Sequence, residues 1–528
     1  MTPESSHPIL VAGQWRPAHA VGTFRPENPA TGEELPDQYP ISGWADCDAA
    51  LEAAVEAAPA LRAAAPGRIA DFLNRFAARI EQRATEIVEM AHLETALPET
   101  PRLAGVELPR TTGQLRQAAA AAAEGSWALP TIDAKAKIRS CYEPIGPVLV
   151  LGPNNFPFAY NCVSGGDFAS AIAAGNPVIG KAHPSHPGTS RLLAAEAEAA
   201  LRESGLPPAT VQLIYHVSNE EGLRMVADRR LAAIGFTGSR AAGLKLKAAA
   251  DAAGKPAYLE MSSLNPVVIL PGALAERGAE IAGEFAASCL MACGQMCTKP
   301  GILVLFAGGG TDAFIAALKE KFESAPVAPL LSGGVARSLG ENVKVLRDAG
   351  ARVITGAGAI KEAGYRFSNT LLSVSGLEFF EEPEKLQTEA FGNASLLVIA
   401  VGADQAAAIL DHFDGNLTGS IYSDTKGADD ALYARLAPLL RARVGRFLND
   451  KMPTGVAVSP AMNHGGPYPA TGHPGFTAVG IPAAMRRFAM LACYDNVRPE
   501  RLPTLLRDES PPGNPWRLID GAWVRGGG

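Results

Sequence analysis

The stretch PVLVL, residues 147–151, is an apolar run of strand length that leads directly into a turn containing proline and asparagine. Three further runs of this kind follow at residues 177–180, 211–215 and 232–236, and alanine-rich segments of helical character separate them. Strands that are apolar along their whole length are buried on both faces, as in a parallel sheet covered by helices. The sequence therefore predicts an α/β domain built on a parallel sheet.

A second series of apolar runs begins near residue 259 and predicts a second α/β domain. Upstream of both series, large apolar side chains between residues 69 and 80 have the spacing of a core-facing helix, and a second helix is expected over residues 84–91. The region from residue 463 is rich in glycine, proline and histidine and is expected to be ordered loop. The strands of the second series are expected at residues 266–270, 303–306, 351–354, 396–399 and 419–422.

The composition is that of a globular protein with more than one domain. The chain has 528 residues, 47% of them hydrophobic, so two or three domains are expected. The net charge of −7 gives no electrostatic reason to bind nucleic acid or an anionic membrane. Residues 1–13 lack a basic segment followed by an apolar one, and no apolar run approaches the length of a membrane-spanning helix. A cytoplasmic protein is therefore expected.

Neither the cysteines nor the histidines form a recognisable framework. Seven cysteines scattered over a chain of this length do not predict a set of disulfides, and most are expected to be small buried hydrophobes. His183 and His186 are close in sequence, but two prolines break the helix that would aim both rings at one ion. No metal site is expected.

Cys297 and Glu260 are the first pair of residues that suggests chemistry. Cys297 lies in the segment GQMCT, in which Gly294 permits close approach of the backbone and Thr298 suits a polar pocket. Glu260 lies in LEMSSLNP, after an apolar approach and before a turn. A thiol can act as a nucleophile, and a carboxylate at a strand end can act as a general base. Each also has an ordinary interpretation, a core cysteine and a surface or capping glutamate, and the residues alone leave both open.

Two further segments follow predicted strands. Asn155 lies in GPNNFP, directly after the strand at residues 147–151, where an amide held between prolines is a good donor to a developing oxyanion. The segment GFTGSRAAG, residues 235–243, precedes a helix whose N-terminus can receive a dinucleotide phosphate. The first can equally be a common turn of proline and asparagine, and the second lacks the full glycine fingerprint.

The order and spacing of these motifs resemble the aldehyde dehydrogenase superfamily over nearly the whole chain. Narrower features, in the segments at residues 165–167, 181–190, 453–456 and 464–471, are similar to one branch of that superfamily. That branch contains α-ketoglutaric semialdehyde (2,5-dioxopentanoate) dehydrogenases and NADP-dependent fatty-aldehyde dehydrogenases. The motifs of the wider resemblance are Asn155-Phe156-Pro157, Lys181, Phe236-Thr237-Gly238-Ser239, Glu260, Gly294-Gln295-x-Cys297 and Glu389-Ala390-Phe391-Gly392.

The resemblance implies an enzyme that oxidises an aldehyde to a carboxylic acid with NAD(P)⁺. Cys297 would attack the aldehyde carbonyl, and the Asn155 side chain and the Cys297 backbone N–H would hold the oxyanion of the thiohemiacetal. Hydride transfer would leave a thioester, which a water activated by Glu260 would hydrolyse. The branch favours α-ketoglutaric semialdehyde as the substrate, with medium- or long-chain aliphatic aldehydes as the alternative. A coenzyme A-acylating enzyme and a non-catalytic scaffold are further alternatives, against which Glu260 and the complete motif set argue.

The resemblance also assigns residues to the cofactor. Lys181 would hold the adenosine ribose, and Glu389 the nicotinamide ribose, with Phe391 packed beside it. Three residues after Lys181 the chain has Pro184, where NAD-preferring relatives often carry a glutamate that binds the ribose hydroxyls, so NADP⁺ is expected over NAD⁺. The remaining cofactor residues would be Phe236, Thr237, Gly238, Ser239 and Gly243. The chain departs from the family pattern at Ser262-Ser263, where glycines are usual, and at Asn393, where a proline is usual.

The fold implied is α/β and of the aldehyde dehydrogenase type: a Rossmann-type cofactor domain, an α/β catalytic domain and a small oligomerisation hairpin. In the hairpin, the strand near residues 138–142 would join the segment near residues 488–494, and its exposed edge would pair with a neighbouring subunit in a homodimer or homotetramer. The implied boundaries are 1–131 and 146–258 for the cofactor domain, 259–458 for the catalytic domain, 132–145 and 459–500 for the oligomerisation and substrate-tunnel segments, and 501–528 for a tail packed on the surface.

Overall fold

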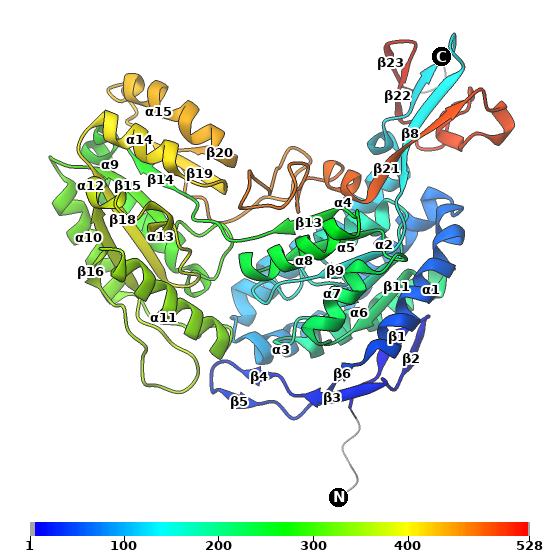
Figure 1. The fold of residues 1–528 in the computed structure, drawn as a ribbon, viewed down its shortest axis with the longest axis horizontal. Helices are drawn as coiled ribbons and strands as arrows, with labels where there is room; N and C mark the ends of the chain where they lie inside the picture. The colour runs from blue at the N-terminus through cyan, green and yellow to red at the C-terminus, as the bar shows by residue number, and fades with distance from the viewer. Residues whose placement is uncertain (1–5, 526–528) are drawn as a thin grey trace, which may run out of the picture.

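The apolar runs predicted as strands belong to two seven-stranded sheets, each flanked by helices (Figure 1). The structure is a computed structural model and describes residues 6–525. The two sheets lie in separate bodies side by side, and a smaller third sheet projects from one end of the molecule. Within the described residues, no helix is both long and apolar enough to cross a membrane.

The first sheet has the strand order β13-β12-β9-β10-β11-β1-β2. Its first five strands are parallel, and β1 and β2 add an antiparallel edge hairpin beside β11. The four strands predicted between residues 147 and 236 are confirmed. The bounds are β1 Ile9–Val11, β2 Gln14–Arg16, β9 Val148–Leu151, β10 Val178–Lys181, β11 Val211–Ile214, β12 Ala233–Thr237 and β13 Ala257–Glu260, with helices α5 Gly166–Ala173, α6 Pro187–Ser204, α7 Asn219–Ala227 and α8 Arg240–Ala252.

The second sheet has the order β16-β17-β18-β15-β14-β19-β20 and contains all five strands predicted for it. The strand at residues 351–354 differs from the other four, because β16 is an antiparallel edge strand that exposes Val353. Strands β17 and β20 were not among those predicted, because polar residues, among them Ser373 and Arg446, interrupt their apolar runs. The bounds are β14 Val267–Ile269, β15 Ile302–Phe306, β16 Arg352–Thr355, β17 Thr370–Ser375, β18 Ala394–Ala400, β19 Asn416–Tyr422 and β20 Val444–Asn449, with helices α9 Pro271–Leu290, α10 Thr311–Ser324, α11 Gly333–Asp348, α12 Gly376–Phe379, α13 Pro383–Leu386, α14 Ala403–His412 and α15 Asp430–Ala442.

The N-terminal helices pack on the helices of the first sheet. In α2, Phe72 and Phe76 belong to the predicted apolar stripe and are fully buried, and α2 contacts α4, α5 and α6. The helices predicted at residues 69–80 and 84–91 are confirmed as α2 and α3. The bounds are β3 Ala20–Phe24, β4 Glu27–Asn28, β5 Glu33–Glu34, β6 Tyr39–Ser42, α1 Trp44–Arg62, α2 Pro66–Gln82, α3 Ala84–Thr95 and α4 Leu108–Glu124.

The projecting third sheet has the order β21-β8-β7-β22-β23. Its strands β8 and β21 pair antiparallel along their whole length, from Ile138 opposite Asp495 to Pro144 opposite Ala489. The C-terminal tail does more than pack on a surface, because β22 and β23 extend this sheet through β7. The bounds are β7 Thr131–Asp133, β8 Ile138–Pro144, β21 Ala489–Asp495, β22 Trp516–Ile519 and β23 Ala522–Arg525.

A long loop and the end of strand β13 position the site. Residues 463–482 form no helix or multi-residue strand and run as loop between the two bodies, as expected from their composition. The strand β13 belongs to the first sheet and ends at Glu260, so the boundary expected at residue 259 falls inside that strand. The second sheet begins only at Val267. Glu260 is therefore the last residue of the first sheet before the chain crosses to the second body.

Candidate active site

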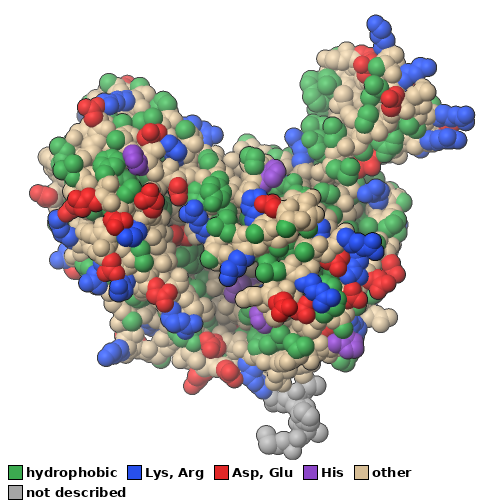
Figure 2. Space-filling model, viewed as in Figure 1, with side chains coloured by type: hydrophobic (Ala, Val, Ile, Leu, Met, Phe, Trp, Pro, Cys, Tyr) green, Lys and Arg blue, Asp and Glu red, His purple; other side chains and the backbone are tan. Residues whose placement is uncertain are grey.

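A cavity of about 760 Å³ lies at the carboxyl ends of β9, β10, β12 and β13, where the first sheet faces the second body. In the space-filling view the surface is hollowed where the two bodies meet (Figure 2). Open parallel sheets bind ligands at this edge of the strands. Among the predicted site residues, Gly243 does not line the cavity. Those that do are Asn155, Lys181, Phe236, Thr237, Gly238, Ser239, Glu260, Cys297, Glu389 and Phe391.

Cys297 follows a tight turn, Met291–Gly294, at the end of α9. The last three residues of this turn all have positive φ. At Gly294 a Cβ atom would also come 2.1 Å from the carbonyl oxygen of Gly392, so only glycine fits there. The turn therefore packs the Cys297 loop directly against the segment that carries Glu389.

Asn265 anchors the other side of the Cys297 loop. Its side-chain amide donates hydrogen bonds to the carbonyl oxygens of Cys297 at 2.9 Å and Lys299 at 2.8 Å. The side-chain oxygen of Asn416 accepts the Asn265 backbone N–H at 3.1 Å. The Asn-Pro turn that follows Glu260 in sequence thus holds the thiol-bearing loop in place beside that carboxylate.

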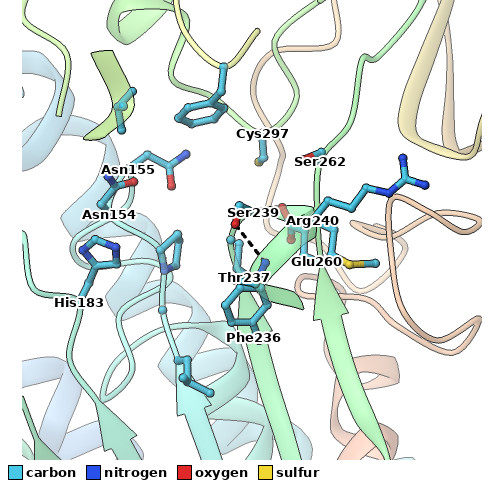
Figure 3. Close-up of a pocket in the computed structure, with 18 of the residues that line it drawn as sticks. Asn154, Asn155, His183, Phe236, Thr237, Ser239, Arg240, Glu260, Ser262 and Cys297 are labelled. Atoms are coloured by element: carbon cyan, nitrogen blue, oxygen red, sulfur yellow. Dashed lines mark hydrogen bonds between the residues drawn. The ribbon is translucent and has the colours of Figure 1, made fainter. Parts of the chain in front are cut away.

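The Cys297 thiol and the Glu260 carboxylate meet at a buried histidine, His464. The Cys297 Sγ lies 3.4 Å from His464 Nε2, and the same nitrogen lies 3.1 Å from Glu260 Oε1. His464 and Glu260 are each 1% exposed. In the close-up, the Cys297 thiol points into the space between Asn155 and Glu260 (Figure 3). The predicted pair is therefore joined by a third titratable side chain.

The electrostatics of this group call for a proton acceptor. Burial and the neighbouring Glu260 carboxylate raise the pKa of the Cys297 thiol well above its usual range. At neutral pH the thiol is therefore protonated and must lose its proton before it can act as a nucleophile. Glu260 and His464 are both within reach. The second carboxylate oxygen of Glu260, Oε2, is buried and accepts no hydrogen bond from any residue between 6 and 525.

Nothing in the local sequence singles out His464, although it opens the segment at residues 464–471. An isolated antiparallel bridge pairs Glu260 with Thr471, and the Met261 N–H donates to the Ala470 carbonyl oxygen at 2.8 Å. These contacts attach the C-terminal loop to the end of β13 and carry His464 into the site. Because 204 residues separate His464 from Glu260, no spacing rule could have found the pair.

The three side chains are also a possible set of metal ligands. One ligand atom each from Glu260, Cys297 and His464 lies within 4.8 Å of the other two, and thiolate, imidazole and carboxylate are the ligands that zinc takes. The histidines considered from the sequence are placed differently. His186 Nε2 is 2.9 Å from the Pro153 carbonyl oxygen, and its ring stacks on that of His183. Among residues 6–525, the side chains that could hold a metal ion together are therefore those at the thiol.

Asn155 lies in the loop after β9, across the thiol from Glu260 (Figure 3). Its side-chain amide donates one hydrogen bond, to the Gln295 carbonyl oxygen at 2.9 Å. The loop is held by Glu107, which accepts backbone N–H groups three and four residues after Asn155 at 2.8 and 3.0 Å. Arg102 donates both to Glu107 at 2.5 Å and to the Asn155 carbonyl oxygen at 3.1 Å. The amide is thus held rigidly, as an oxyanion donor requires.

The far part of the cavity has the features of a dinucleotide site. Ser239 caps helix α8, and its hydroxyl accepts the Ala242 N–H at 3.3 Å (dashed in Figure 3). The N-terminus of a helix is a natural binding site for phosphate. Lys181 ends β10 beside His183 and Pro184 in the cavity wall. Burial lowers the pKa of the Lys181 ammonium to about 8.

Gly243 lies within α8 and serves packing. A Cβ atom at this position would come 2.9 Å from the Met261 side chain and 3.3 Å from the Phe236 ring. The absence of a side chain lets α8 lie close to the ends of β12 and β13. Gly243 therefore acts on the cavity only through residues that line it.

Glu389 lies at the Cys297 end of the cavity. Burial raises the pKa of its carboxyl group to about 7, against smaller lowering effects of Lys299, the Ser262 hydroxyl and the Ser263 backbone N–H. Ser262 therefore replaces a glycine of the family pattern with a hydrogen-bonding partner for Glu389. Asn393, the other departure, is buried, and its amide donates to the Phe367 carbonyl oxygen at 2.7 Å and to a second side chain.

Comparison with known proteins identifies relatives that match almost the whole chain. Residues 15–437 match the model of the aldehyde dehydrogenase family. The chain is 37% identical to α-ketoglutaric semialdehyde dehydrogenase 2 of Azospirillum brasilense, over 97% of this chain and 98% of that protein. It is 35% identical to α-ketoglutaric semialdehyde dehydrogenase of Acinetobacter baylyi, over 90% of this chain and 91% of that protein.

Solved structures share the fold at lower sequence identity. Lactaldehyde dehydrogenase from Escherichia coli superposes with a TM-score of 0.78 and 22% identity, over 93% of this chain and 98% of that one. A mutant of aldehyde dehydrogenase C from Pseudomonas syringae, solved with NAD⁺ and octanal, superposes with a TM-score of 0.79 and 20% identity, over 95% of this chain and 99% of that one.

Proposed function

The chain belongs to the aldehyde dehydrogenase family, and on that premise we propose that it oxidises α-ketoglutaric semialdehyde to the dicarboxylate with NADP⁺. The reaction rests on one observation above all, that His464 contacts both the Cys297 thiol and the Glu260 carboxylate. The substrate is supported by the names of two relatives that match at least 90% of the chain.

The first half of the reaction takes place at Cys297. Its thiol proton passes to His464 or Glu260, and the sulfur forms a bond to the aldehyde carbon. The Asn155 amide and the Cys297 backbone N–H receive the negative charge that develops on the aldehyde oxygen. A nicotinamide dinucleotide, when bound in the cavity, would supply the hydride acceptor needed to oxidise the thiohemiacetal to a thioester.

The second half of the reaction belongs to Glu260. Its free oxygen Oε2 takes a proton from a water molecule, and the hydroxyl group adds to the thioester carbon. The carbon–sulfur bond then breaks, the carboxylic acid leaves, and the Cys297 sulfur is free for the next cycle. This assignment requires that Glu260 be unprotonated when the thioester has formed.

The residues that line the cavity from the N-terminus of α8 to Glu389 fit a dinucleotide. The N-terminus of α8 behind Ser239 suits the pyrophosphate, and Lys181 and Glu389 suit the two riboses. The carboxylates that line the cavity are Glu260 and Glu389, both close to Cys297, whereas Lys181 has His183 and Pro184 beside it. A 2′-phosphate on the adenosine ribose would meet a cation there and no carboxylate, which supports NADP⁺ over NAD⁺.

The affinity for NADP⁺ is expected to pass through a maximum between about pH 7 and about pH 8. Below this range Glu389, whose pKa is about 7, takes up a proton and accepts fewer ribose hydrogen bonds. Above it Lys181, whose pKa is about 8, loses the charge that pairs with the phosphate. Titration of NADP⁺ binding by intrinsic fluorescence from about pH 6 to about pH 9 measures both limbs.

Two variants test which residue causes each decrease in NADP⁺ affinity. In E389Q the affinity for NADP⁺ should no longer fall at low pH, and in K181M it should no longer fall at high pH. If both variants keep both decreases, the assignment is wrong. Steady-state rates add a second check, because kcat/KM should be about tenfold higher with NADP⁺ than with NAD⁺. A tenfold preference for NAD⁺ would disprove the cofactor proposal.

The substrate proposal is tested with a panel of aldehydes. With 2,5-dioxopentanoate, succinic semialdehyde and octanal at one pH, kcat/KM should be highest for 2,5-dioxopentanoate and about tenfold or more above octanal. The reason is that a site built for polar groups loses binding energy when they are missing. The alternative of an aliphatic-aldehyde enzyme would be favoured if octanal were the best substrate.

The projecting sheet supports a homodimer or homotetramer. Its strands β8 and β21 expose Ile138, Met490 and Leu491, which are 39%, 54% and 57% exposed. Apolar side chains along strands of this kind are typical of a surface that another subunit covers. Light scattering after size exclusion measures the assembly, and a stable monomer would contradict it. The cytoplasmic location stays a prediction from the sequence.

A further inference from the structure

Two arginines from different bodies of the molecule act electrostatically on the Cys297 thiol and have no place in the reaction described above. Arg110 lies in the first turn of α4, and Arg446 lies in β20. Burial is the main reason that the pKa of the Cys297 thiol is raised. The positive charges of these two guanidinium groups partly oppose that rise. The two cations therefore share the surroundings of the nucleophile.

The position of Arg110 is defined by aromatic side chains of the cavity wall. Its guanidinium group lies 5.4 Å from the centre of the Tyr160 ring and 5.6 Å from that of Phe156, and it donates a hydrogen bond to the Tyr160 hydroxyl at 3.2 Å. Tyr160 in turn contacts the His464 ring, with 6.0 Å between ring centres. Arg110 is thus one aromatic ring away from the histidine that contacts the thiol.

Arg446 is held by the loop at residues 453–455, part of a segment that the reaction leaves without a role. Its terminal nitrogens donate to the carbonyl oxygens of Pro453 and, at 2.9 Å, of Gly455. Between them, the Thr454 hydroxyl donates to the carbonyl oxygen of Thr298 at 3.3 Å, next to Cys297 in the chain. The loop therefore fixes Arg446 relative to the nucleophile.

Neither cation is neutralised by the protein. Within residues 6–525, Arg110 and Arg446 make no ion pair with a carboxylate, and the Nε atom of each is buried without a hydrogen-bond partner. Other arginines in this part of the protein are paired, such as Arg102 with Glu107 at 2.5 Å and Arg487 with Asp167 at 2.7 Å. Partly buried guanidinium groups without a counter-charge lose hydration that a bound anion can replace.

We propose that Arg110 and Arg446 form the binding site for the carboxylate at the far end of the substrate, so that the enzyme selects short aldehydes with an anionic tail. Arg110, whose one hydrogen bond within residues 6–525 is to the Tyr160 hydroxyl, forms the direct hydrogen bonds, and Arg446 adds charge from the opposite body. A planar guanidinium group matches a carboxylate in shape and charge. An alkyl tail would instead leave both cations desolvated and unpaired. This inference rests on the proposed function.

The test compares two aldehydes of equal length on the same protein. For the wild type, kcat/KM is measured with 2,5-dioxopentanoate and with pentanal, and the ratio of the two is the readout. In R110Q this ratio should fall by about 10- to 100-fold, since a charged hydrogen bond to the carboxylate is lost. R110K, which keeps the charge but not the planar fork, should lose less of the ratio. An unchanged ratio in R110Q would overturn the proposal.

A measurement on the wild type covers the case in which R110Q does not fold. Glutarate, which carries carboxylates but no aldehyde, should compete with 2,5-dioxopentanoate, whereas glutaramide of the same length should not. Equal inhibition by both compounds would overturn the carboxylate site. A different result would contradict the proposed function itself, namely a higher kcat/KM of the wild type for pentanal or octanal than for 2,5-dioxopentanoate. A wild type that prefers 2,5-dioxopentanoate while R110Q keeps the same ratio retains the function and removes the role of Arg110.

Discussion

Replacement of Cys297 by alanine is expected to lower kcat for aldehyde oxidation by about 10⁴-fold or more, the largest effect of any single change. The reason is that the carbon–sulfur bond holds the substrate through hydride transfer and through hydrolysis, so no step survives without it. The rate of NADPH formation followed by absorbance measures the loss. Binding of NADP⁺ should persist, because Cys297 lies at one end of the cavity and Lys181 in its far part.

A matched control separates loss of the nucleophile from loss of a thiol elsewhere. Cys493 is the exposed cysteine of β21 and has no contact with the cavity. C493S should keep the wild-type kcat. If C297A retained wild-type NADPH formation, the covalent mechanism would be wrong, whatever the result for C493S.

The second large effect is expected for Glu260→Gln, which should lower the steady-state kcat by about 10²- to 10³-fold and leave a burst of NADPH. Glutamine cannot take a proton from water, so the thioester accumulates after one hydride transfer per active site. The burst should reach about one NADPH per active site in a rapid-mixing experiment. Loss of both the burst and the turnover would give Glu260 a role before the thioester.

His464 provides the contrasting variant. Because the pKa of the Cys297 thiol lies well above neutral, the thiol needs a proton acceptor, and His464 Nε2 is 3.4 Å from its sulfur. H464N should therefore slow the burst itself, while E260Q slows only the steps after it. If H464N showed the same fast burst as the wild type, Glu260 alone would be the acceptor of the thiol proton.

Much of the fold could be predicted because its signals are local. A short apolar run bounded by turn residues, such as residues 148–151, indicates a strand buried on both faces, and the spacing in α2 indicates a helix within a few turns. The strands that were not predicted, β17 and β20, contain polar residues whose hydrogen-bond partners lie in other segments of the chain. In β20, Arg446 interrupts the apolar run in the sequence. Only the structure shows that the loop at residues 453–455 accepts hydrogen bonds from its side chain.

The candidate site divides in the same way. Cys297, Glu260 and Asn155 stand in motifs whose turns can be recognised residue by residue, and all three line the cavity. His464 has no such signal. It enters the site because the end of β13 pairs with a loop more than 200 residues later, through Glu260 and Thr471.

The sequence alone sufficed to predict the α/β class, most strands of the two mainly parallel sheets, and the residues that we propose as nucleophile, base and oxyanion donor. Only the tertiary structure placed His464 between the thiol and the carboxylate, and Arg110 and Arg446 around the nucleophile. The physical reason is the range of the interactions. Periodicity and turn geometry act within a few residues and leave a pattern in the chain, whereas a proton acceptor or a pair of cations acts through space, between segments that only folding brings together.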